Sequence, residues 1–493
     1  MPVHLYNTLS GRVEEFAPTQ DHLVRMYACG PTVYDYGHIG NFRTFVAVDI
    51  LRRYLRQRGY KLHHVMNITD VDDKIIRNSS STGLTVQEYT AKYQKAFLED
   101  AAALHIEQPQ IVRATENIPQ MAAFIAKLVE KGFAYKTDDG SYYFRIAKFP
   151  AYGTLSKRDF AGMEDGARVD VDEYEKDNAR DFALWKAPKP GEASWESVIG
   201  PGRPGWHIEC SVMSMQELGE SFDLHAGGED LIFPHHENEI AQSESLTGKP
   251  FAHFWFHARF LLVEGEKMSK SAGNFFTLRD LVLKGHKPSS IRYLLASVPY
   301  TNQLNFTFDG LQQATASVER LRNFRARLAG KFAEGSSLAM TSLAEQTSKR
   351  LRAALDDDLN TAQAQGAIFD MVRAANAAID SGDIKSGDTP SLIAALGDFD
   401  EIFSVLRDDD AAQMQHIYEW AKLEGREKDI SPELLDIVRS AALTDQQIDA
   451  KIEQMAAARK ARDFATSDAI RAELTANGIL IEQTKEGIHW RRK

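Results

Sequence analysis

The sequence predicts an α/β protein that begins with a doubly wound parallel sheet and ends in helical domains. Near the N-terminus, an apolar run at 23–27 precedes a glycine-bearing turn and a helix expected over 44–58. A second apolar run, 61–68, follows Gly59, so these elements are typical of a right-handed β–α–β unit in a doubly wound sheet. From Asp309 onward the hydrophobic pattern becomes helical.

Changes in composition divide the rest of the chain. A helix, the apolar run 142–146 and a Gly/Asp-rich, poorly periodic segment indicate an insertion between two halves of the α/β domain. In the helical part, Asn360 is an expected helix N-cap, and the positions of Ile368, Met371, Val372, Ala375 and Ile379 mark one apolar face. A helix pair over 444–474 and a hairpin, 478–481 against 488–490, end the chain.

A chain of 493 residues is too long for one hydrophobic core, so several domains are expected. We assign the α/β domain to 1–115 and 197–250, the insertion to 116–196, and a region with a Lys/Ser-rich loop to 251–308. A helical bundle follows at 309–405, a linker at 406–440 and a small α+β domain at 441–493.

Composition limits the classes of function. The net charge of −12 argues against a protein that coats nucleic acid nonspecifically, but local basic patches remain compatible with a specific nucleic acid partner. The most apolar stretch, 251–263, is interrupted by His253, His257 and Arg259, and the first 16 residues lack an apolar signal core. We therefore expect a cytoplasmic protein without a membrane-spanning segment.

The loop that starts at Lys267 is the first candidate for chemistry. Its sequence, Lys-Met-Ser-Lys-Ser-Ala-Gly-Asn, combines two ammonium groups and two hydroxyls with a small-residue hinge, which suits a triphosphate. Alone, such a loop is usually a solvated surface turn. A second element favours phosphate binding, because the turn at 34–41 between the first strand and its helix aims backbone N–H groups at an anion.

The chain has only two cysteines, and both belong to a candidate metal site. Cys29 ends the first strand and Cys210 closes the segment 204–210. About 25 residues later, Pro234 suits the first turn of a helix that puts His235 and Glu239 on one face. Two thiolates, one imidazole and one carboxylate are a zinc ligand set. The alternatives are an ordinary polar helix face, or a metal that His236 binds in competition.

With these motifs assembled, the chain resembles the cysteinyl-tRNA synthetases, a family of class I aminoacyl-tRNA synthetases. The resemblance covers nearly the whole length and rests on the segments 38–41, 67–70, 206–210, 233–239 and 267–271. It implies a Rossmann-like catalytic domain split by a connective insertion, then a stem-contact region, a helical bundle and an anticodon-binding domain. It also implies one zinc ion held by the positions of Cys29, Cys210, His235 and Glu239.

The resemblance further implies ATP-dependent activation of L-cysteine, with Mg²⁺, and transfer of the cysteinyl group to tRNA(Cys) by a monomer. His38, Lys267 and Lys270 are expected to be catalytic. The ATP contacts are expected from Gly37, His38, Gly40, Asn41, Lys267, Ser269 and Lys270. In the class motif a histidine stands where this chain has Asn41, which can donate a hydrogen bond to phosphate but cannot carry a proton.

The resemblance also suggests the remaining contacts. Trp206 and His225 are expected to line the amino-acid pocket, and Thr69 and Asp230 to hold the substrate ammonium. At the C-terminus, Trp490, Arg491 and Arg492 offer a stacking ring and phosphate-binding charges for anticodon bases. Both tryptophans have a structural alternative, namely a packing aromatic. His63 and His64 point to opposite faces of a predicted strand and are interpreted as structural.

Two other functions fit parts of this pattern. A ligase that adenylates cysteine and passes it to a small amine resembles the catalytic half but lacks an anticodon-reading tail. An idle RNA-binding protein would keep the fold and the zinc for structure only. The residues after Asp309 favour tRNA over the first, and His38, Lys267 and Lys270 argue against the second.

Overall fold

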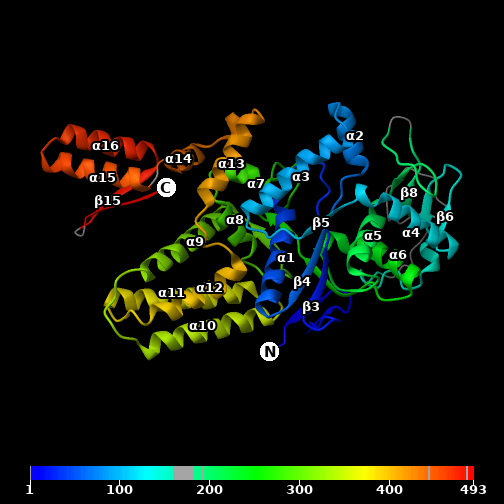
Figure 1. Ribbon diagram of the computed structural model, residues 1–493, viewed down its shortest axis with the longest axis horizontal. Helices are drawn as coiled ribbons and strands as arrows, with labels where there is room; N and C mark the ends of the chain where they lie inside the picture. Colours follow the sequence, from blue (N-terminus) through cyan, green and yellow to red (C-terminus); the bar gives the residue numbers. More distant parts are fainter. Residues whose placement is uncertain are drawn as a thin grey trace.

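The computed structural model describes residues 2–158, 181–189, 192–441, 443, 445–484 and 487–492. The molecule is elongated, with the small C-terminal unit at one end and the insertion at the other (Figure 1). The α/β domain and the helical bundle lie between these ends. In the described part of the chain, every helix is too short or too polar to cross a lipid bilayer.

The centre of the α/β domain is a five-stranded parallel sheet in the order β11-β10-β3-β4-β5. The two central strands, β10 and β3, belong to the two different halves of the domain, so the chain winds outward from the middle in both directions. This confirms the doubly wound fold, whose ligand crevice lies at the carboxyl ends of the strands where the order reverses. The strands are β3 (Leu23–Ala28), β4 (Lys61–Ile68), β5 (Gln110–Arg113), β10 (Phe222–Gly228) and β11 (Ala252–Ala258).

The helix after β3 begins earlier than the sequence suggests. We expected it over 44–58, but α1 spans Ile39–Gln57. His38 and Asn41 cap it reciprocally: the His38 side chain accepts from the Asn41 N–H, and the Asn41 side chain accepts from the His38 N–H. The prediction was wrong because the glycines of this segment were assigned to the turn, whereas the capping pair draws Gly40 into the helix.

The insertion packs as a helix against a four-stranded antiparallel sheet, β6-β7-β8-β9. Stacked Phe133, Phe144 and Phe182 fill its core. Within the apolar run 142–146, Tyr142–Phe144 form a strand, and part of the Gly/Asp-rich segment, 159–180, lies outside the described residues. The elements here are α4 (Ile118–Glu130), β6 (Ala134–Lys136), β7 (Tyr142–Phe144), β8 (Phe182–Lys186) and β9 (Arg203–Pro204).

Several shorter elements frame the sheet. An N-terminal hairpin consists of β1 (His4–Asn7) and β2 (Arg12–Glu15), and α2 (Asp73–Thr82) and α3 (Val86–Ala103) follow β4. The helices α5 (Trp206–Leu218) and α6 (Glu237–Thr247) flank β10 in the sequence. The Lys267 loop projects from a small sheet of β12 (Leu261–Val263), β13 (Glu266–Lys267) and β14 (Leu304–Phe306), and it leads to α7 (Leu278–Leu283) and α8 (Pro288–Leu295).

A bundle of long helices follows the Lys267 loop and the helices after it. Asn360 caps α11 as expected, and Ile368, Met371, Val372 and Ala375 are buried, while Ile379 is partly buried. The helices are α9 (Phe308–Leu328), α10 (Leu338–Asp356), α11 (Thr361–Ser381) and α12 (Thr389–Phe403).

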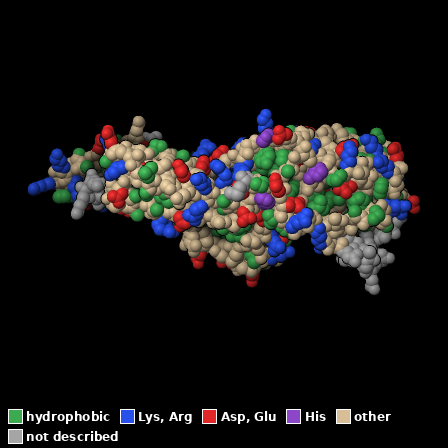
Figure 2. Space-filling view, turned by 90° about the horizontal axis from the view of Figure 1, so that it is seen from below, with side chains coloured by type: hydrophobic (Ala, Val, Ile, Leu, Met, Phe, Trp, Pro, Cys, Tyr) green, Lys and Arg blue, Asp and Glu red, His purple; other side chains and the backbone are tan. Residues whose placement is uncertain are grey.

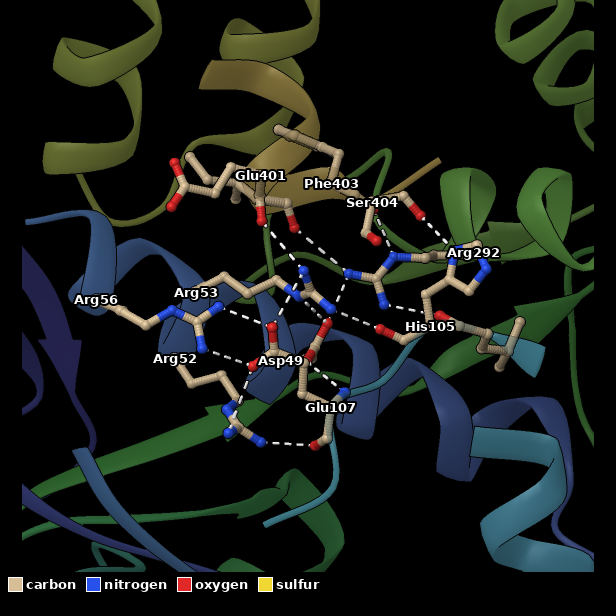
Figure 3. A network of polar contacts seen from close by, with 12 residues as sticks. Asp49, Arg52, Arg53, Arg56, His105, Glu107, Arg292, Glu401, Phe403 and Ser404 are labelled. Atoms are coloured by element: carbon tan, nitrogen blue, oxygen red, sulfur yellow. Dashed lines mark hydrogen bonds and ion pairs between the residues drawn. The ribbon is translucent and has the colours of Figure 1, made fainter. Parts of the chain in front are cut away.

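Buried charges hold the helical bundle against α1 and α8, and Figure 3 shows this polar network. Asp49 of α1 accepts hydrogen bonds from Arg53 Nε at 2.8 Å and from Arg292 Nη2 at 2.6 Å. The same two arginines donate to backbone carbonyls at the end of α12, Arg53 to Glu401 and Arg292 to Phe403. Charges from α1 and α8 thus satisfy the free carbonyls at the end of a bundle helix and fix how the bundle packs on the rest of the chain.

The C-terminal region continues through α13 (Asp410–Leu423) and α14 (Pro432–Ala441) to the small terminal unit. The expected helix pair appears as α15 (Asp445–Lys460) and α16 (Phe464–Ala476), although residue 444, where we began it, lies outside the described residues. The expected hairpin pairs β15 (Ile479–Thr484) with β16 (Gly487–Arg492). A separate small cluster of Ile448, Ile452, Met455, Leu474 and Ile479 forms the core of this unit.

Candidate active site

A cavity of about 950 Å³ opens at the carboxyl ends of β3 and β10. Cys29, Trp206 and Asp230 line one part of it, and His38 and Lys270 are also in its wall. The cavity therefore lies at the reversal point of the sheet, where a doubly wound fold binds its ligand.

The turn before α1 forms one wall of the cavity. Gly37, His38, Gly40 and Asn41 all line the cavity. A Cβ on Gly40 would lie 2.9 Å from His38 Nδ1, so only glycine lets the imidazole fold over the first turn of the helix. Burial and the nearby Lys270 lower the pKa of His38 to about 4, and the ring is therefore neutral near pH 7.

The Lys267 loop faces this turn. Lys270 Nζ lies 2.8 Å from Asp35 Oδ2, and this contact raises the pKa of Lys270. Asn274 fastens the loop to itself: its Oδ1 accepts from Ser269 N at 2.8 Å, and its Nδ2 donates to Lys267 O at 3.2 Å. The partly exposed Asp35 carboxylate thus holds the Lys270 ammonium at the wall of the cavity.

The four predicted metal ligands lie together. One potential ligand atom from each of Cys29, Cys210, His235 and Glu239 falls within 4.8 Å of all the others, and all four residues are buried. The two sulfur atoms are 3.7 Å apart, and His235 Nε2 lies 3.0 Å from Glu239 Oε1. Zinc–sulfur bonds of about 2.3 Å in a tetrahedron require sulfur atoms about 3.8 Å apart, so the donor set fits zinc in type and in spacing.

Three separate elements supply these ligands. Cys29 follows the last residue of β3, and Cys210 lies in the second turn of α5. The helix expected from Pro234 instead starts at Glu237, after an irregular turn at Ile232–His236, yet His235 and Glu239 still share one face. The turn is irregular because Phe233 has an extended backbone (φ −141°, ψ 130°).

Charges within the quartet balance one another. Burial disfavours ionisation of Cys210, but its contacts with Cys29 and His235 lower the pKa of this thiol to about 6. Burial raises the pKa of Cys29 well above its usual value. Burial also opposes charge on His235 and Glu239, yet their mutual attraction raises the pKa of His235 to about 10 and helps lower that of Glu239 to about 2.

A layer of histidines surrounds the quartet, and the sequence analysis missed part of it. His207 Nδ1 lies 2.9 Å from His235 Nδ1, and His257 Nε2 lies 2.7 Å from His236 Nδ1. The sequence analysis gave His207 and His257 no role at the metal site, since their contacts with His235 and His236 depend on the three-dimensional packing. His236 Nε2 approaches Cys29 Sγ to 3.3 Å, and a second set of four possible ligands, Cys29, His225, His236 and Glu239, overlaps the predicted one.

The residues expected at the amino-acid pocket are only partly together. Trp206 is 41% exposed and stacks on the His235 ring at 4.2 Å, and Asp230 lines the same cavity. His225 is fully buried, stacks on Trp255 and lies 2.8 Å from Glu239, so it supports the quartet from behind.

Thr69 is also buried rather than exposed in the cavity. Its hydroxyl donates to Glu209 Oε2 at 2.8 Å, and its oxygen accepts from Asn67 at 3.2 Å. The Asn67 side-chain oxygen in turn accepts from Gly30 N, the residue after Cys29. Thr69 is therefore part of a polar chain that joins the segments of the two cysteines.

Comparisons with known proteins decide the family. A family model described as the tRNA synthetases class I (C) catalytic domain matches residues 15–316, and a DALR domain model matches 350–407. The chain is 65% identical over 495 residues to the cysteine–tRNA ligase of Koribacter versatilis, with 100% of both chains covered. It is 54% identical, with the same coverage, to the cysteine–tRNA ligase of Solibacter usitatus. The chain belongs to the cysteine–tRNA ligase family.

Solved structures of other synthetases share the fold of this cysteine–tRNA ligase family member. Methionyl-tRNA synthetase of Mycobacterium tuberculosis aligns with a TM-score of 0.55 at 14% identity and covers 86% of this chain and 95% of its own. The LeuRS of Agrobacterium radiobacter K84 aligns with a TM-score of 0.57 at 11% identity and covers 82% of this chain and 86% of its own. These neighbours support the class I architecture and nothing finer.

Of the C-terminal residues predicted to contact tRNA, the structure describes the side chain of Trp490. Trp490 packs partly buried on the terminal helix pair, and its indole N–H donates to Asp449 Oδ1 at 2.7 Å. This contact corresponds to the packing alternative for Trp490. The side chains of Arg491 and Arg492 lie outside the described residues. On the face shown in Figure 2, acidic and basic side chains are interspersed rather than gathered in one basic area.

Proposed function

We propose that this protein activates L-cysteine with ATP to form cysteinyl-adenylate and transfers the cysteinyl group to the 3′ end of tRNA(Cys). Membership of the cysteine–tRNA ligase family supports the overall reaction. The observation that carries the choice of amino acid is the buried quartet of Cys29, Cys210, His235 and Glu239, which adjoins a cavity also lined by His38 and Lys270.

In this proposal the quartet holds one zinc ion. Zinc with an open coordination position favours a substrate thiolate over a hydroxyl, since it is a borderline-soft ion that binds sulfur well. An apolar pocket alone separates near-isosteres by only about 10²-fold, which is too little to reject serine. The protein's own contribution is to bury the quartet, to fix His235 through His207, and to place Trp206 over the His235 ring.

In the activation step, a carboxylate oxygen of cysteine attacks the α-phosphorus of ATP. A new O–P bond forms, the bond to the bridging oxygen breaks, and pyrophosphate leaves. Gly37, His38, Gly40 and Asn41 line the part of the cavity that would receive the phosphates. Neutral His38 donates to a phosphate oxygen from Nε2, because its Nδ1 accepts from the Asn41 N–H. Lys267 and Lys270 neutralise charge on the departing pyrophosphate, with Ser269 between them and Mg²⁺ carried by ATP.

The substrate ammonium is assigned to Asp230, whose carboxylate lines the cavity, and to the polar groups around Thr69. Trp206 covers the amino acid. His225 does not contact the substrate but positions Glu239, which lies 2.8 Å from it. In the second step a ribose hydroxyl of tRNA attacks the carbonyl carbon of the adenylate, and AMP leaves. Trp490, Arg491 and Arg492 are proposed to lie near the anticodon in a protein that works as a cytoplasmic monomer.

The domain assignment is part of the same proposal. The α/β domain at 1–115 and 197–250 would hold the activation chemistry, 116–196 the insertion, and 251–308 the tRNA stem contact. The bundle at 309–405 and the linker at 406–440 would carry the anticodon-binding unit at 441–493. The strand β9 at Arg203–Pro204 belongs to the sheet of the insertion, which favours a C-terminal boundary of the insertion beyond residue 196.

The test is ATP–pyrophosphate exchange and tRNA charging with purified protein of known zinc content. Exchange should depend on cysteine, serine should be rejected by far more than 10²-fold, and removal of zinc by a chelator should abolish the discrimination. Metal-free protein that still distinguishes the two amino acids would contradict the zinc proposal. Transfer of cysteine to a small amine instead of tRNA would favour the rival ligase.

A further inference from the structure

The helix α13 lies against the catalytic half of the molecule, far along the chain from the residues it contacts. Figure 1 shows α13 beside α7, between the α/β domain and the C-terminal unit. His416 of α13 lies 3.2 Å from Glu99 of α3. Glu424, which follows α13, lies 2.7 Å from Lys92, also of α3. The connection to the C-terminal unit is therefore fixed to a helix of the α/β domain.

Trp420 makes the most specific of these contacts. Its indole Nε1 donates to the hydroxyl oxygen of Tyr36 at 3.1 Å, and the two rings meet edge to face at 5.2 Å. Tyr36 lines the cavity and lies two residues before His38. A residue 384 positions away in the sequence thus holds the turn that we assign to phosphate binding.

From Tyr36 the contacts continue to Lys270. The backbone N–H of Tyr36 donates to Asp35 Oδ1 at 2.8 Å, and Asp35 Oδ2 accepts from Lys270 Nζ at 2.8 Å. Hydrogen bonds therefore link Trp420 to Tyr36, the Tyr36 backbone to Asp35, and Asp35 to Lys270 without interruption. The orientation of the Asp35 carboxylate, and with it the position of the Lys270 ammonium, depends on where Tyr36 is held.

The surroundings make this arrangement stiff. The Arg279 guanidinium lies 5.1 Å from the Tyr36 ring centre and 4.6 Å from that of Trp420, and Asp100 Oδ1 accepts from Arg279 Nε at 2.8 Å in the buried interior. The Tyr93 ring also packs edge to face with Tyr36, with the ring centres 5.2 Å apart. An aromatic–cation stack of this kind resists sliding, because both the ring faces and the edge-on hydrogen bond would be lost together.

The segment just after α13 also contacts α7, which follows the Lys267 loop. Arg426 Nη2 lies 2.9 Å from Asp280 Oδ1. Asp280 caps α7 together with Thr277, and Thr277 forms an isolated β-bridge with His38. The same segment therefore contacts the phosphate-binding turn through Tyr36 and the residues after the loop through Asp280.

We propose that Trp420 is a positioning residue for the activation step, acting through Tyr36 and Asp35 on the Lys270 ammonium. This inference rests on the proposed function, because it concerns the same ATP end of the cavity. The segment before the C-terminal unit would thus affect ATP binding indirectly, through Tyr36 and Asp35. It should not affect the cysteine end, because the contacts of α13 described above do not include the metal quartet.

The test is a double-mutant cycle with Trp420→Phe and Tyr36→Phe, measured by cysteine-dependent ATP–pyrophosphate exchange. Trp420→Phe keeps a ring but removes the donor, and Tyr36→Phe removes the acceptor. Losing one hydrogen bond of this kind should raise KM for ATP about threefold to tenfold, with KM for cysteine unchanged. The double variant should be no worse than the worse single variant, since both changes break the same contact.

Two further variants make the result specific. Asp35→Asn should raise KM for ATP in the same way and should make an added Trp420→Phe change silent. Tyr418→Phe, on the same helix, removes a hydroxyl that has no role in this series and should behave as wild type. Thermal unfolding of each variant shows whether the fold is intact. If Trp420→Phe is destabilised, the KM for ATP of Tyr36→Phe and of Asp35→Asn decides the outcome instead.

The outcomes separate this inference from the proposed function. Wild-type protein without cysteine-dependent exchange would overturn the function itself. Normal wild-type exchange with an unchanged KM for ATP in Trp420→Phe, or strictly additive effects in the cycle, would overturn only the role of Trp420.

Discussion

His64 makes the stability of the protein sensitive to acid. It lies on β4, is 6% exposed, and neither ring nitrogen has a hydrogen-bond partner among the described residues. Burial, with a smaller effect of Arg52, lowers its pKa from 6.5 to about 3. The folded protein thus holds a neutral imidazole that the unfolded chain would protonate below pH 6.5.

The magnitude follows from these two pKa values. The unfolded state binds the proton more tightly, so stability falls as the pH drops through 6.5 and continues to fall until about pH 3. At pH 5 the unfolded chain gains RT ln(1 + 10^1.5), which amounts to about 2 kcal/mol, whereas at pH 8 this term is close to zero. His64→Leu removes the titrating group and should remove this loss.

Urea unfolding of wild type and His64→Leu at pH 8 and pH 5 measures the effect. The free energy of unfolding should fall by about 2 kcal/mol less in the variant than in wild type between these pH values, since all other groups titrate alike in both. His63→Leu is the matched control, because His63 lies on the opposite face of the strand against Gln110, and it should keep the wild-type pH dependence. An equal pH dependence in wild type and His64→Leu would refute the reasoning.

Three further predictions concern the active site and the domain junction. Lys270→Ala should slow ATP–pyrophosphate exchange by about 10²–10³, and an unchanged rate would remove Lys270 from the mechanism. Cys210→Ser should lose zinc in metal analysis of the purified protein, together with the preference for cysteine over serine; retained zinc with normal discrimination would contradict the ligand assignment. Asp49→Asn should lower the free energy of unfolding in urea by about 3 kcal/mol or more, because the buried Arg292 would lose its ion pair and Arg53 would keep only the longer contact with Glu107 at 3.4 Å; a loss below about 1 kcal/mol would argue against this role.

The sequence predicted the parts of the fold whose signals are local. The strand at Lys61–Ile68 was predicted at its observed bounds because apolar residues recur along it after the break at Gly59. The start of α1 was missed because it depends on a reciprocal cap between His38 and Asn41 rather than on hydrophobic periodicity. Capping by an imidazole is rare enough that composition alone does not reveal it.

The metal quartet was predictable for a different reason. Two cysteines in the whole chain, with a histidine and a glutamate four residues apart, leave few alternatives, and the structure brings these four side chains within 4.8 Å. The surrounding histidines were not predictable, because His207 and His257 lie in apolar segments and their contacts depend on how α5, β11 and the turn before α6 pack. Thr69 and His225 were expected at the cavity itself, whereas they lie one layer behind it.

The two ends of the cavity are therefore held in different ways. The thiol end is held by nearby layers of the sheet domain, where His207, His225 and Glu209 brace the ligand-bearing segments. The end that we propose for ATP depends on a remote partner, since Trp420 of α13 donates a hydrogen bond to Tyr36. A change that loosens α13 should consequently weaken ATP binding while leaving cysteine selection intact, because nothing in the described contacts of Trp420 reaches the quartet.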